Sequence, residues 1–495
     1  PSVATFFHNF DRISVEYGFE RRPDKCEFSC HESAHQEVCA TFRCERTNRF
    51  DAVELLGSPI GGSNGDAFAA ALATAAESTF DRIVEMPGAH QAATVLAYCG
   101  RGLTTHLCRT ALPDLCHIRR VDDALVRAAA TIYGVPHDST IIEQLRLKYR
   151  EGGFGFRPAA PYARVAFLAS VIETNETQAQ LAPALRVHPL ASDPDIARAM
   201  SEIVVACPTL ADSIGLYVNG HQGHEHRHLQ RQWSSILDGV TLESRLHAAG
   251  AAAPSGKARL MSCAGAHSAL HPIVDATRAY PLPWLDNAQT SITARFRLGL
   301  PLFEETRPCR LCRGHVTCDV YGEHMSSCMG GGHRTRLHHG ARNDLAQLAS
   351  SALACPRMEV TCFPAAPARR CDVLLQAHSH GGQQCALDYA CIHPLLHGRL
   401  TDAARTAGGA ATAYEATKRA EYGELARQAD LHFVPMIQDT FGAWGVSADT
   451  LLKQLARRVA DRFGAARSTT LHHIRTMLLV AHQRRWATLL LGNVV

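Results

Sequence analysis

Lysine is scarce in this sequence, and long apolar runs are absent. The 495 residues include 50 lysines and arginines, and the lysines are Lys25, Lys148, Lys257, Lys418 and Lys453. A lysine in a chemically sensible position is therefore not explained by a generally lysine-rich surface. No stretch of about 18 apolar residues is present, so neither a membrane-spanning helix nor a membrane partner is expected.

A secretion signal is also absent from the first residues. The start, PSVATFFHNF, has no basic stretch, apolar core or small-residue cleavage site, and we expect that it begins inside a longer reading frame. Eighteen cysteines in a chain of this length do not make a disulfide-dense protein. A reducing compartment is therefore expected, with most cysteines as buried thiols.

The net charge of +3 is too small to argue for a nucleic-acid partner. Its distribution is more informative, because basic residues gather in 295–342 and in 453–485. These segments would suit phosphate contacts, although a charge run is more often a solvated face.

The apolar pattern predicts helical domains followed by a mixed α/β domain, in a chain long enough for about three domains. The spacing from 66 to 179 is typical of packed amphipathic helices, and helices continue to the small-residue run at 248–258, which predicts a flexible link. Further on we expect, in order, a helix at 336–353, strands at 358–363, 371–375 and 385–392, a helix at 401–430 and a strand at 432–437.

A segment rich in cysteine and histidine lies before this α/β domain. Its candidate metal ligands are Cys309, Cys312, His324 and Cys328. The first two form a CxxC, a spacing that lets two thiolates reach one tetrahedral zinc ion from a tight turn. The last two are four residues apart and would share one face of a helix. His315 and Cys318 offer an alternative second pair, so the sequence predicts a structural zinc site more firmly than its ligands.

Three of the predicted strands carry carboxylates, namely Glu359, Asp372 and Asp388. A carboxylate within an apolar strand is costly unless it is paired or binds a metal. Two carboxylates on adjacent strands can hold one divalent cation, which polarises a phosphoryl oxygen and lowers the pKa of bound water. Lys418, on the next predicted helix, would orient the water or stabilise the negative charge on the phosphorane. Tyr422 lies one turn further on the same face.

These residues resemble the C-terminal half of non-LTR retrotransposon proteins that carry a restriction-like endonuclease. In that family the nuclease has a PD-(D/E)XK fold whose lysine has moved from the third strand to the next helix, with a tyrosine four residues on. KRAEY at 418–422 matches this displacement, and Asp388 is followed by Tyr389 and Ala390 in place of the usual DxK lysine. The resemblance covers about 300–490.

The match to this family has two departures. Cys371 replaces the proline of the PD motif, and the Arg-His pair that follows the knuckle is represented by His338 and His339. Neither departure removes a metal ligand.

Upstream segments resemble reverse transcriptases of the same family. RPDKCEF at 22–28 is similar to the lysine-bearing turn after the polymerase catalytic loop, and FDAVELLGSPIGG at 50–62 is similar to the hairpin that grips the primer. The paired metal-binding aspartates of the polymerase would lie before Pro1. This chain alone is therefore not expected to synthesise DNA.

The resemblance implies a multidomain protein that is mostly α plus α/β. The implied segments are a reverse transcriptase palm remnant (1–65), a helical thumb (66–180), a helical connector (181–295), a zinc knuckle (296–335) and a PD-(D/E)XK-like nuclease domain with basic C-terminal helices (336–495).

The implied activity is magnesium-dependent nicking of target double-stranded DNA in the nucleus, which primes reverse transcription of the element RNA. Zinc would be structural, and Asp372 and Asp388 would bind magnesium. The implied catalytic residues are Asp372, Asp388, Lys418, Glu359 and Tyr422. The alternative is a non-catalytic, zinc-dependent nucleic-acid-binding relic of a degenerate element.

Overall fold

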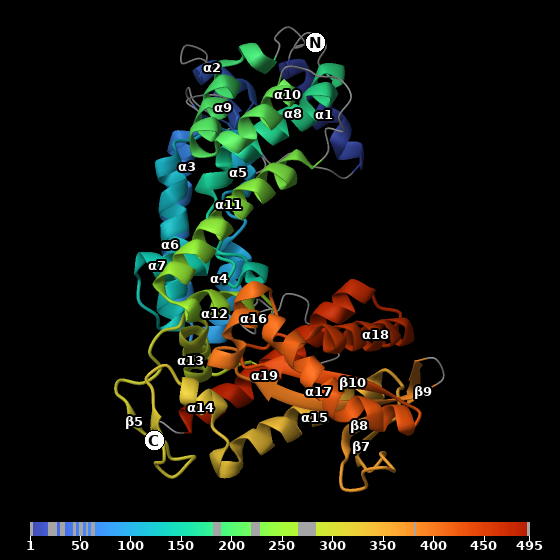
Figure 1. Ribbon diagram of the computed structural model, residues 1–495. Helices are drawn as coiled ribbons and strands as arrows, with labels where there is room; N and C mark the ends of the chain where they lie inside the picture. Colours follow the sequence, from blue (N-terminus) through green and yellow to red (C-terminus); the bar gives the residue numbers. More distant parts are fainter. Residues whose placement is uncertain are drawn as a thin grey trace. The chain divides into compact units, whose positions relative to one another are not determined.

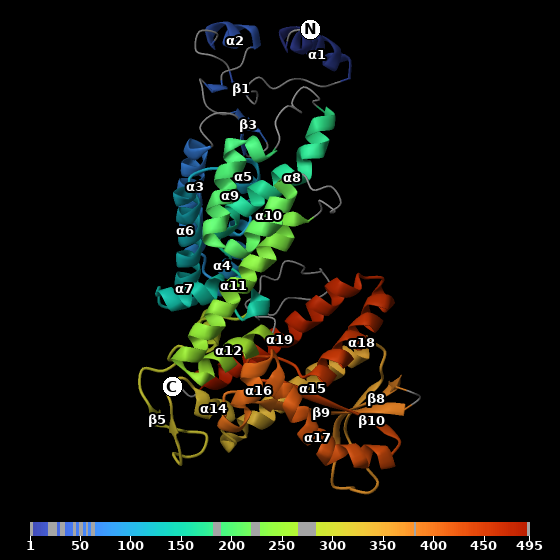
Figure 2. The ribbon, with the colours of Figure 1, turned by 45° about the horizontal axis from the view of Figure 1, so that its top comes forward.

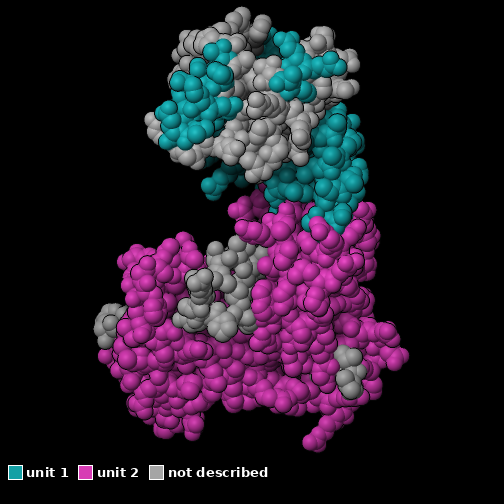
Figure 3. Space-filling view, turned by 180° about the vertical axis from the view of Figure 1, so that it is seen from behind, with its two compact units in different colours: residues 1–79, 101–124, 158–240 teal, residues 80–100, 125–157, 241–495 magenta. Residues whose placement is uncertain are grey.

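The chain forms two compact units (Figure 3). The computed structural model describes residues 3–17, 27–29, 35–42, 46–48, 53–55, 58–60, 65–181, 190–218, 228–265, 284–380 and 383–492. This part is mostly helical with small sheets. Unit 1 comprises 1–79, 101–124 and 158–240, and unit 2 comprises 80–100, 125–157 and 241–495. No helix in the described part is both long and apolar enough to span a membrane.

Unit 1 begins with short elements: α1 (Val3–Ser14), β1 (Glu27–Ser29), α2 (His35–Phe42), β2 (Arg46–Asn48), β3 (Val53–Leu55) and β4 (Ser58–Ile60). Strands β1 and β2 pair in parallel, and β3 pairs antiparallel with β4. The hairpin expected within 50–62 is thereby confirmed as a hairpin. The predicted lysine-bearing turn at 22–28 lies largely outside the described residues.

Three further helices of unit 1 pack around Trp233, namely α8 (Ala163–Leu181), α9 (Pro194–Ala206) and α10 (Ala211–Val218). The short helix α5 (Thr105–Thr110) packs against α8 in a neighbouring cluster. Trp233 is buried with Leu168 and Ile203, and its indole N–H donates to Ser213 at 3.0 Å. Asp193 caps α9 by accepting from two backbone N–H groups of the first turn. The buried residues of these helices are the apolar ones whose spacing predicted helices here.

Within the described residues, helices occupy most of the range predicted as helical. They include α3 (Asp66–Val84), α4 (Ala89–Gly100), α6 (Leu115–Tyr133), α7 (Ser139–Arg146), α11 (Leu229–Ala252), α12 (Pro254–Gly265) and α13 (Asn287–Leu298). The flexible link expected at 248–258 is wrong, because α11 and α12 are separated by Ala253 alone. Alanine favours a helix, and Pro254 starts the next helix at the position where a missing N–H does no harm.

The α/β part of unit 2 has the predicted order of elements (Figures 1 and 2). It consists of α15 (His333–Ser351), β7 (Pro356–Val360), β8 (Cys371–His380), β9 (Gln383–Ile392), α16 (Leu400–Arg405), α17 (Gly409–Gln428), β10 (Leu431–Asp439), α18 (Val446–Phe463) and α19 (Arg467–Leu491). The predicted single helix at 401–430 is wrong, because extended Thr406 and left-handed Gly408 (φ 71°) separate α16 from α17.

The four strands form one sheet in the order β10-β9-β8-β7. Strand β9 pairs antiparallel with β8 and parallel with β10. A parallel pair needs a crossover connection, which α16 and α17 supply.

The two faces of the sheet bury different helices. Val373, Leu387 and Val434 form one row across the strands, and they pack in the same core cluster as residues of α15, α18 and α19. The next residues along each strand point to the other face. There Leu374, Ala386 and Phe433 form a second row, packed with Ala426 of α17. The inner strand β9 is therefore covered on both faces.

Because of the packing on the sheet, we expect two apolar residues of α18 to contribute differently to the free energy of unfolding. Leu452 is fully buried, and Val446 is 63% exposed. We expect Leu452→Ala to lower the free energy of unfolding by about 2–5 kcal/mol, because it removes buried methyl groups and leaves a cavity. The control Val446→Ala should change it by less than about 0.5 kcal/mol. Urea unfolding followed by circular dichroism measures both, and equal effects would contradict this packing.

Candidate functional site

The cysteine- and histidine-rich segment folds into a hairpin and a short helix. Strands β5 (Arg307–Pro308) and β6 (Thr317–Cys318) pair antiparallel, and α14 (Glu323–Ser327) follows. The turn after β5 is closed by a hydrogen bond from the Gly314 N–H to the Cys309 carbonyl, 2.8 Å long. Arg313 and Gly314 both have positive φ there. This turn brings the two cysteines of the CxxC to one side of the hairpin.

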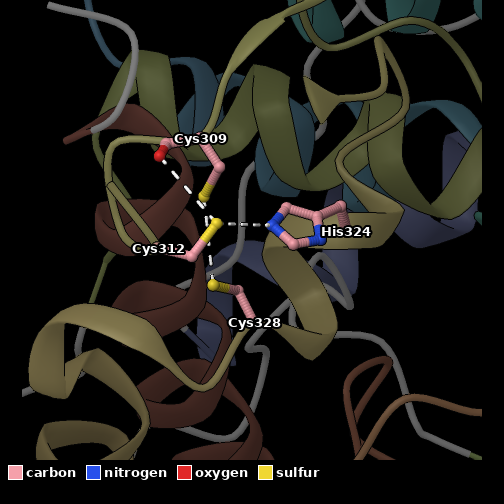
Figure 4. Close-up of side chains that lie close together, drawn as sticks. All are labelled: Cys309, Cys312, His324 and Cys328. Carbon is pink, nitrogen blue, oxygen red and sulfur yellow. Dashed lines mark hydrogen bonds between the residues drawn. The ribbon is translucent and has the colours of Figure 1, made fainter. Parts of the chain in front are cut away.

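Four candidate ligand side chains converge at this point (Figure 4). One donor atom from each of Cys309, Cys312, His324 and Cys328 lies within 4.8 Å of the others. The Sγ atoms of Cys309 and Cys328 are 3.9 Å apart, and Cys312 Sγ is 3.7 Å from His324 Nε2. Tetrahedral zinc with Zn–S bonds of about 2.3 Å would separate two sulfurs by about 3.8 Å. The group therefore fits a structural zinc ion in both geometry and ligand type.

The alternative second pair lies outside this group. His315 is exposed, and Cys318 is buried beside Cys309 without joining the four. One detail of the sequence argument is wrong, because α14 ends at Ser327 and Cys328 has an extended backbone (φ −61°, ψ 129°). The bend at Cys328, rather than a shared helix face, turns its sulfur toward Cys309.

Two residues that support the metal group were missed by the sequence argument. The carboxylate of Asp319 accepts the backbone N–H groups of Glu323 and His324 at 3.0 and 2.8 Å, which fixes the start of α14. Gly330 passes so close to the turn that an added Cβ would lie 2.1 Å from the Leu311 carbonyl. An acidic residue just before a short helix was the available sequence signal for the first.

Hydrogen bonds make one thiol of the group acidic. Burial raises the pKa of Cys309, but the backbone N–H of Cys312 and the side chain of His324 outweigh burial and lower this pKa to about 7. A thiolate is the form that binds zinc. The site thus favours the metal-binding form of this sulfur near neutral pH.

A second polar site lies on the sheet, where β8 and β9 each carry an aspartate. The pairing of Val373 with Leu387 places Asp372 opposite Asp388 in the same register. Asp372 accepts the backbone N–H of Tyr389 at 2.6 Å and contacts His338 Nε2 of α15 at 2.9 Å. Cross-strand neighbours have side chains on one face, so two carboxylates are close together here.

Asp388 is 7% exposed and forms an ion pair with Lys418 of α17, with Oδ2 and Nζ 2.9 Å apart. Burial raises the pKa of Asp388, the Lys418 ammonium opposes that shift, and the charge of Asp372 adds to it. Burial lowers the pKa of Lys418, but the negative charges of Asp388 and Glu421 together leave it raised. The positive charge of Lys418 thus offsets both the burial of Asp388 and its repulsion by Asp372.

Tyr422 forms the apolar side of this second site. The ammonium of Lys418 lies 5.2 Å from the centre of its ring. The ring also stacks on Phe433 of β10, with centroids 5.4 Å apart, and contacts Phe363 at 5.7 Å. Tyr422 therefore holds Lys418 by a cation–π contact on a packed aromatic surface.

Glu359 is turned toward a different partner. It has a positive φ of 53°, and it interrupts the pairing between Met358–Val373 and Val360–Cys371. Its carboxylate forms an ion pair with Arg342 of α15. Within the described residues, the Cys3His group brings its four possible metal ligands close together, and the three acids do not form such a group.

Comparison with known proteins gives no relative: no family model matches the chain, and no curated protein matches it.

The metal group gives a direct test of its own ligand choice. We expect purified protein to hold about one zinc ion per chain and Cys312→Ser to lose it, because a ligand is removed from a tetrahedral site. Cys318→Ser is the matched control, since this buried cysteine neighbours the group without belonging to it. It should keep its zinc in mass-spectrometric metal analysis. If Cys318→Ser also lost its zinc, Cys318 would be a ligand and the second ligand pair would have to be reassigned.

Proposed function

We propose that this chain is part of a non-LTR retrotransposon protein and that its α/β part is a metal-dependent DNA endonuclease of the restriction-like kind. One observation carries the proposal: Asp372 and Asp388 lie opposite each other on paired strands, with Lys418 2.9 Å from the buried Asp388. Two acids and a helix-borne lysine are the groups that metal-dependent phosphodiester hydrolysis needs.

Magnesium is the proposed catalytic cofactor, held by Asp372 and Asp388. Carboxylate oxygens suit this hard cation, and a second positive charge would oppose the burial and the repulsion by Asp372 that raise the pKa of Asp388. Bound there, magnesium would polarise a phosphoryl oxygen and acidify water. Lys418 would stabilise the charge that develops on the phosphoryl group, and Tyr422 would keep its ammonium in place. In this proposal Asp372 and Asp388 hold the metal, and Glu359, which pairs with Arg342, is an additional catalytic residue.

The proposed substrate is target double-stranded DNA, and the proposed second partner is the element RNA. Arg310 and Arg313 are exposed on the turn of the metal group, and Arg457 is exposed on α18. Such side chains contact phosphates and position a duplex without reading its sequence.

We further propose a nuclear location and the following segments: a palm remnant at 1–65, a thumb at 66–180, a connector at 181–295, a zinc knuckle at 296–335 and the nuclease at 336–495.

A specific observation favours a second candidate, a non-catalytic, zinc-dependent nucleic-acid-binding protein. Each acid of the second site already has a basic partner: His338 for Asp372, Lys418 for Asp388 and Arg342 for Glu359. A fully paired acid set can be purely structural. This candidate predicts binding of nucleic acid that depends on zinc, with no cleavage under any divalent ion.

Nicking of supercoiled plasmid by the full chain separates the two candidates. We expect nicking with Mg²⁺ or Mn²⁺ and none with chelator, and we expect Asp388→Ala to lose it because a metal ligand is gone. The matched control is Glu424→Ala, since Glu424 is an exposed acid on α17 that pairs with Arg427. A folded, zinc-loaded protein that binds DNA but never nicks it would favour the binding protein.

Lys418 and Lys453 allow a second comparison, within the few lysines of the chain. We expect Lys418→Met to reduce the nicking rate by about 100- to 1000-fold, because a charge that stabilises the transition state is lost. Plasmid binding, measured by gel shift, should change little. Lys453→Met removes an exposed lysine that pairs with Asp449 and should keep the nicking rate. Similar losses in both variants would mean that general charge, and not the position of Lys418, matters.

A further inference from the structure

The carboxylate of Glu421 joins two cations beside the pair of aspartates. Glu421 lies on α17, next to Tyr422 in the sequence, and its two oxygens contact different partners. Oε1 is 2.5 Å from Nη1 of Arg369, and Oε2 is 3.5 Å from Nζ of Lys418. The guanidinium and the ammonium are therefore spaced so that one anion with two oxygens can contact both.

Arg369 is held at this point by its own loop and by an aromatic ring. It lies in the connection between β7 and β8, where its backbone N–H closes a turn by donating to the Ala366 carbonyl at 2.9 Å. Its guanidinium lies 5.1 Å from the centre of the Tyr422 ring, which also contacts Lys418. Neither contact involves Glu421. Arg369 therefore keeps its place beside the ring when its carboxylate partner is exchanged for another anion.

The ion pair of Arg369 with Glu421 is open to such an exchange. The two side chains are 43% and 36% exposed, and exposed ion pairs hold their partners weakly. Without an anion between them, Arg369 and Lys418 would repel each other. A backbone phosphate carries two anionic oxygens, and a guanidinium binds such oxygens through parallel N–H donors. A phosphate therefore meets the same requirement as the carboxylate of Glu421.

We propose that Arg369 and Lys418 form a subsite for a phosphate of the DNA backbone and that Glu421 competes with this phosphate for both cations. Arg369 lies three residues before Asp372, so the subsite adjoins the proposed metal pair. Arg369 binds the strand that is to be cut, and Glu421 weakens that binding. The role of the subsite in cleavage rests on the proposed nuclease function, whereas its binding of DNA can be measured without cleavage.

The salt dependence of DNA binding tests the contact of Arg369. Binding of a short fluorescein-labelled duplex to the full chain is followed by fluorescence anisotropy at several NaCl concentrations, without added divalent ion. Arg369→Gln should weaken binding and reduce the slope of log Kd against the logarithm of the NaCl concentration by about one, because one phosphate contact is lost. The matched control is Arg427→Gln, since Arg427 is an exposed arginine that pairs with Glu424. An unchanged slope in Arg369→Gln, or equal losses in both variants, overturns the proposal.

Glu421→Gln tests the competition and should act in the opposite direction. It keeps the shape of the side chain and removes its charge, so DNA binding should tighten about 2- to 5-fold, the strength of an exposed ion pair. Glu424→Gln removes the same charge three residues further along α17 and should leave Kd nearly unchanged. The gain of Glu421→Gln should disappear when Arg369→Gln is added. Weaker binding by Glu421→Gln, or an equal gain in Glu424→Gln, overturns the competition.

The nicking assay separates the role of Arg369 from that of Lys418. Arg369→Gln should raise the DNA concentration that gives half the maximal rate and keep the rate at saturation, because the lost contact is made equally before and during the reaction. Circular dichroism and zinc content check that each variant is folded. A loss of the saturated rate as large as that of Lys418→Met would overturn the assignment of Arg369 to phosphate binding.

The subsite and the nuclease function can fail separately. If the wild type binds DNA but never nicks it, and Arg369→Gln still reduces the slope, the nuclease function fails and the subsite stands. If the wild type nicks DNA and the slope is unchanged in Arg369→Gln, the subsite is overturned. A slope that falls with an RNA duplex of the same sequence, and not with DNA, overturns the assignment to the DNA substrate.

Discussion

The ion pair between Asp388 and Lys418 is the interaction on which the arrangement of the second site depends. Strand β9 is the inner strand that joins the parallel pair to the antiparallel pair, and both of its faces are covered. A carboxylate in that position must be neutralised or paired. The 2.9 Å contact with Lys418 meets this requirement, and Lys418 lies on the side of α17 that packs on the sheet through Tyr422 and Ala426. Tyr422 is placed one turn further by the same constraint.

The two candidate sites are joined by α15. This helix follows the metal group directly, and Arg334 in its first turn donates to the carbonyls of Ser327 and Cys391. Further along, His338 reaches Asp372 and Arg342 reaches Glu359. A helix anchored at its start by the metal group therefore positions the partners of two acids. A structural metal and a carboxylate site can be mechanically connected in this way without sharing a ligand.

Local patterns were sufficient to predict much of this protein. The CxxC, the order of strands and helices after residue 336, and the helical range from 66 to 179 all depend on spacing within short segments. The break between α16 and α17 was missed, although the glycines at 408 and 409 marked it. A left-handed residue stops a helix whatever the apolar pattern around it.

Tertiary contacts account for what the sequence could not provide. Glu359 was expected beside the two aspartates because all three lie on neighbouring strands. Its positive φ depends on how β7 meets β8, and Arg342 is 17 residues away on a helix whose packing no local pattern specifies. The contact of His338 with Asp372, across 34 residues, is of the same kind.

The crossover between β9 and β10 has a consequence for the order in which the domain folds. Strands β8 and β9 are neighbours in sequence, so their pairing closes a short loop at little entropic cost. The parallel partner β10 and the helix that carries Lys418 can dock only after a longer segment has been ordered, which is slower. We therefore expect the hairpin to form first. Two mutually repelling aspartates would then be brought together in the nascent sheet before their countercharge arrives, which makes this hairpin the step most sensitive to salt and pH during folding.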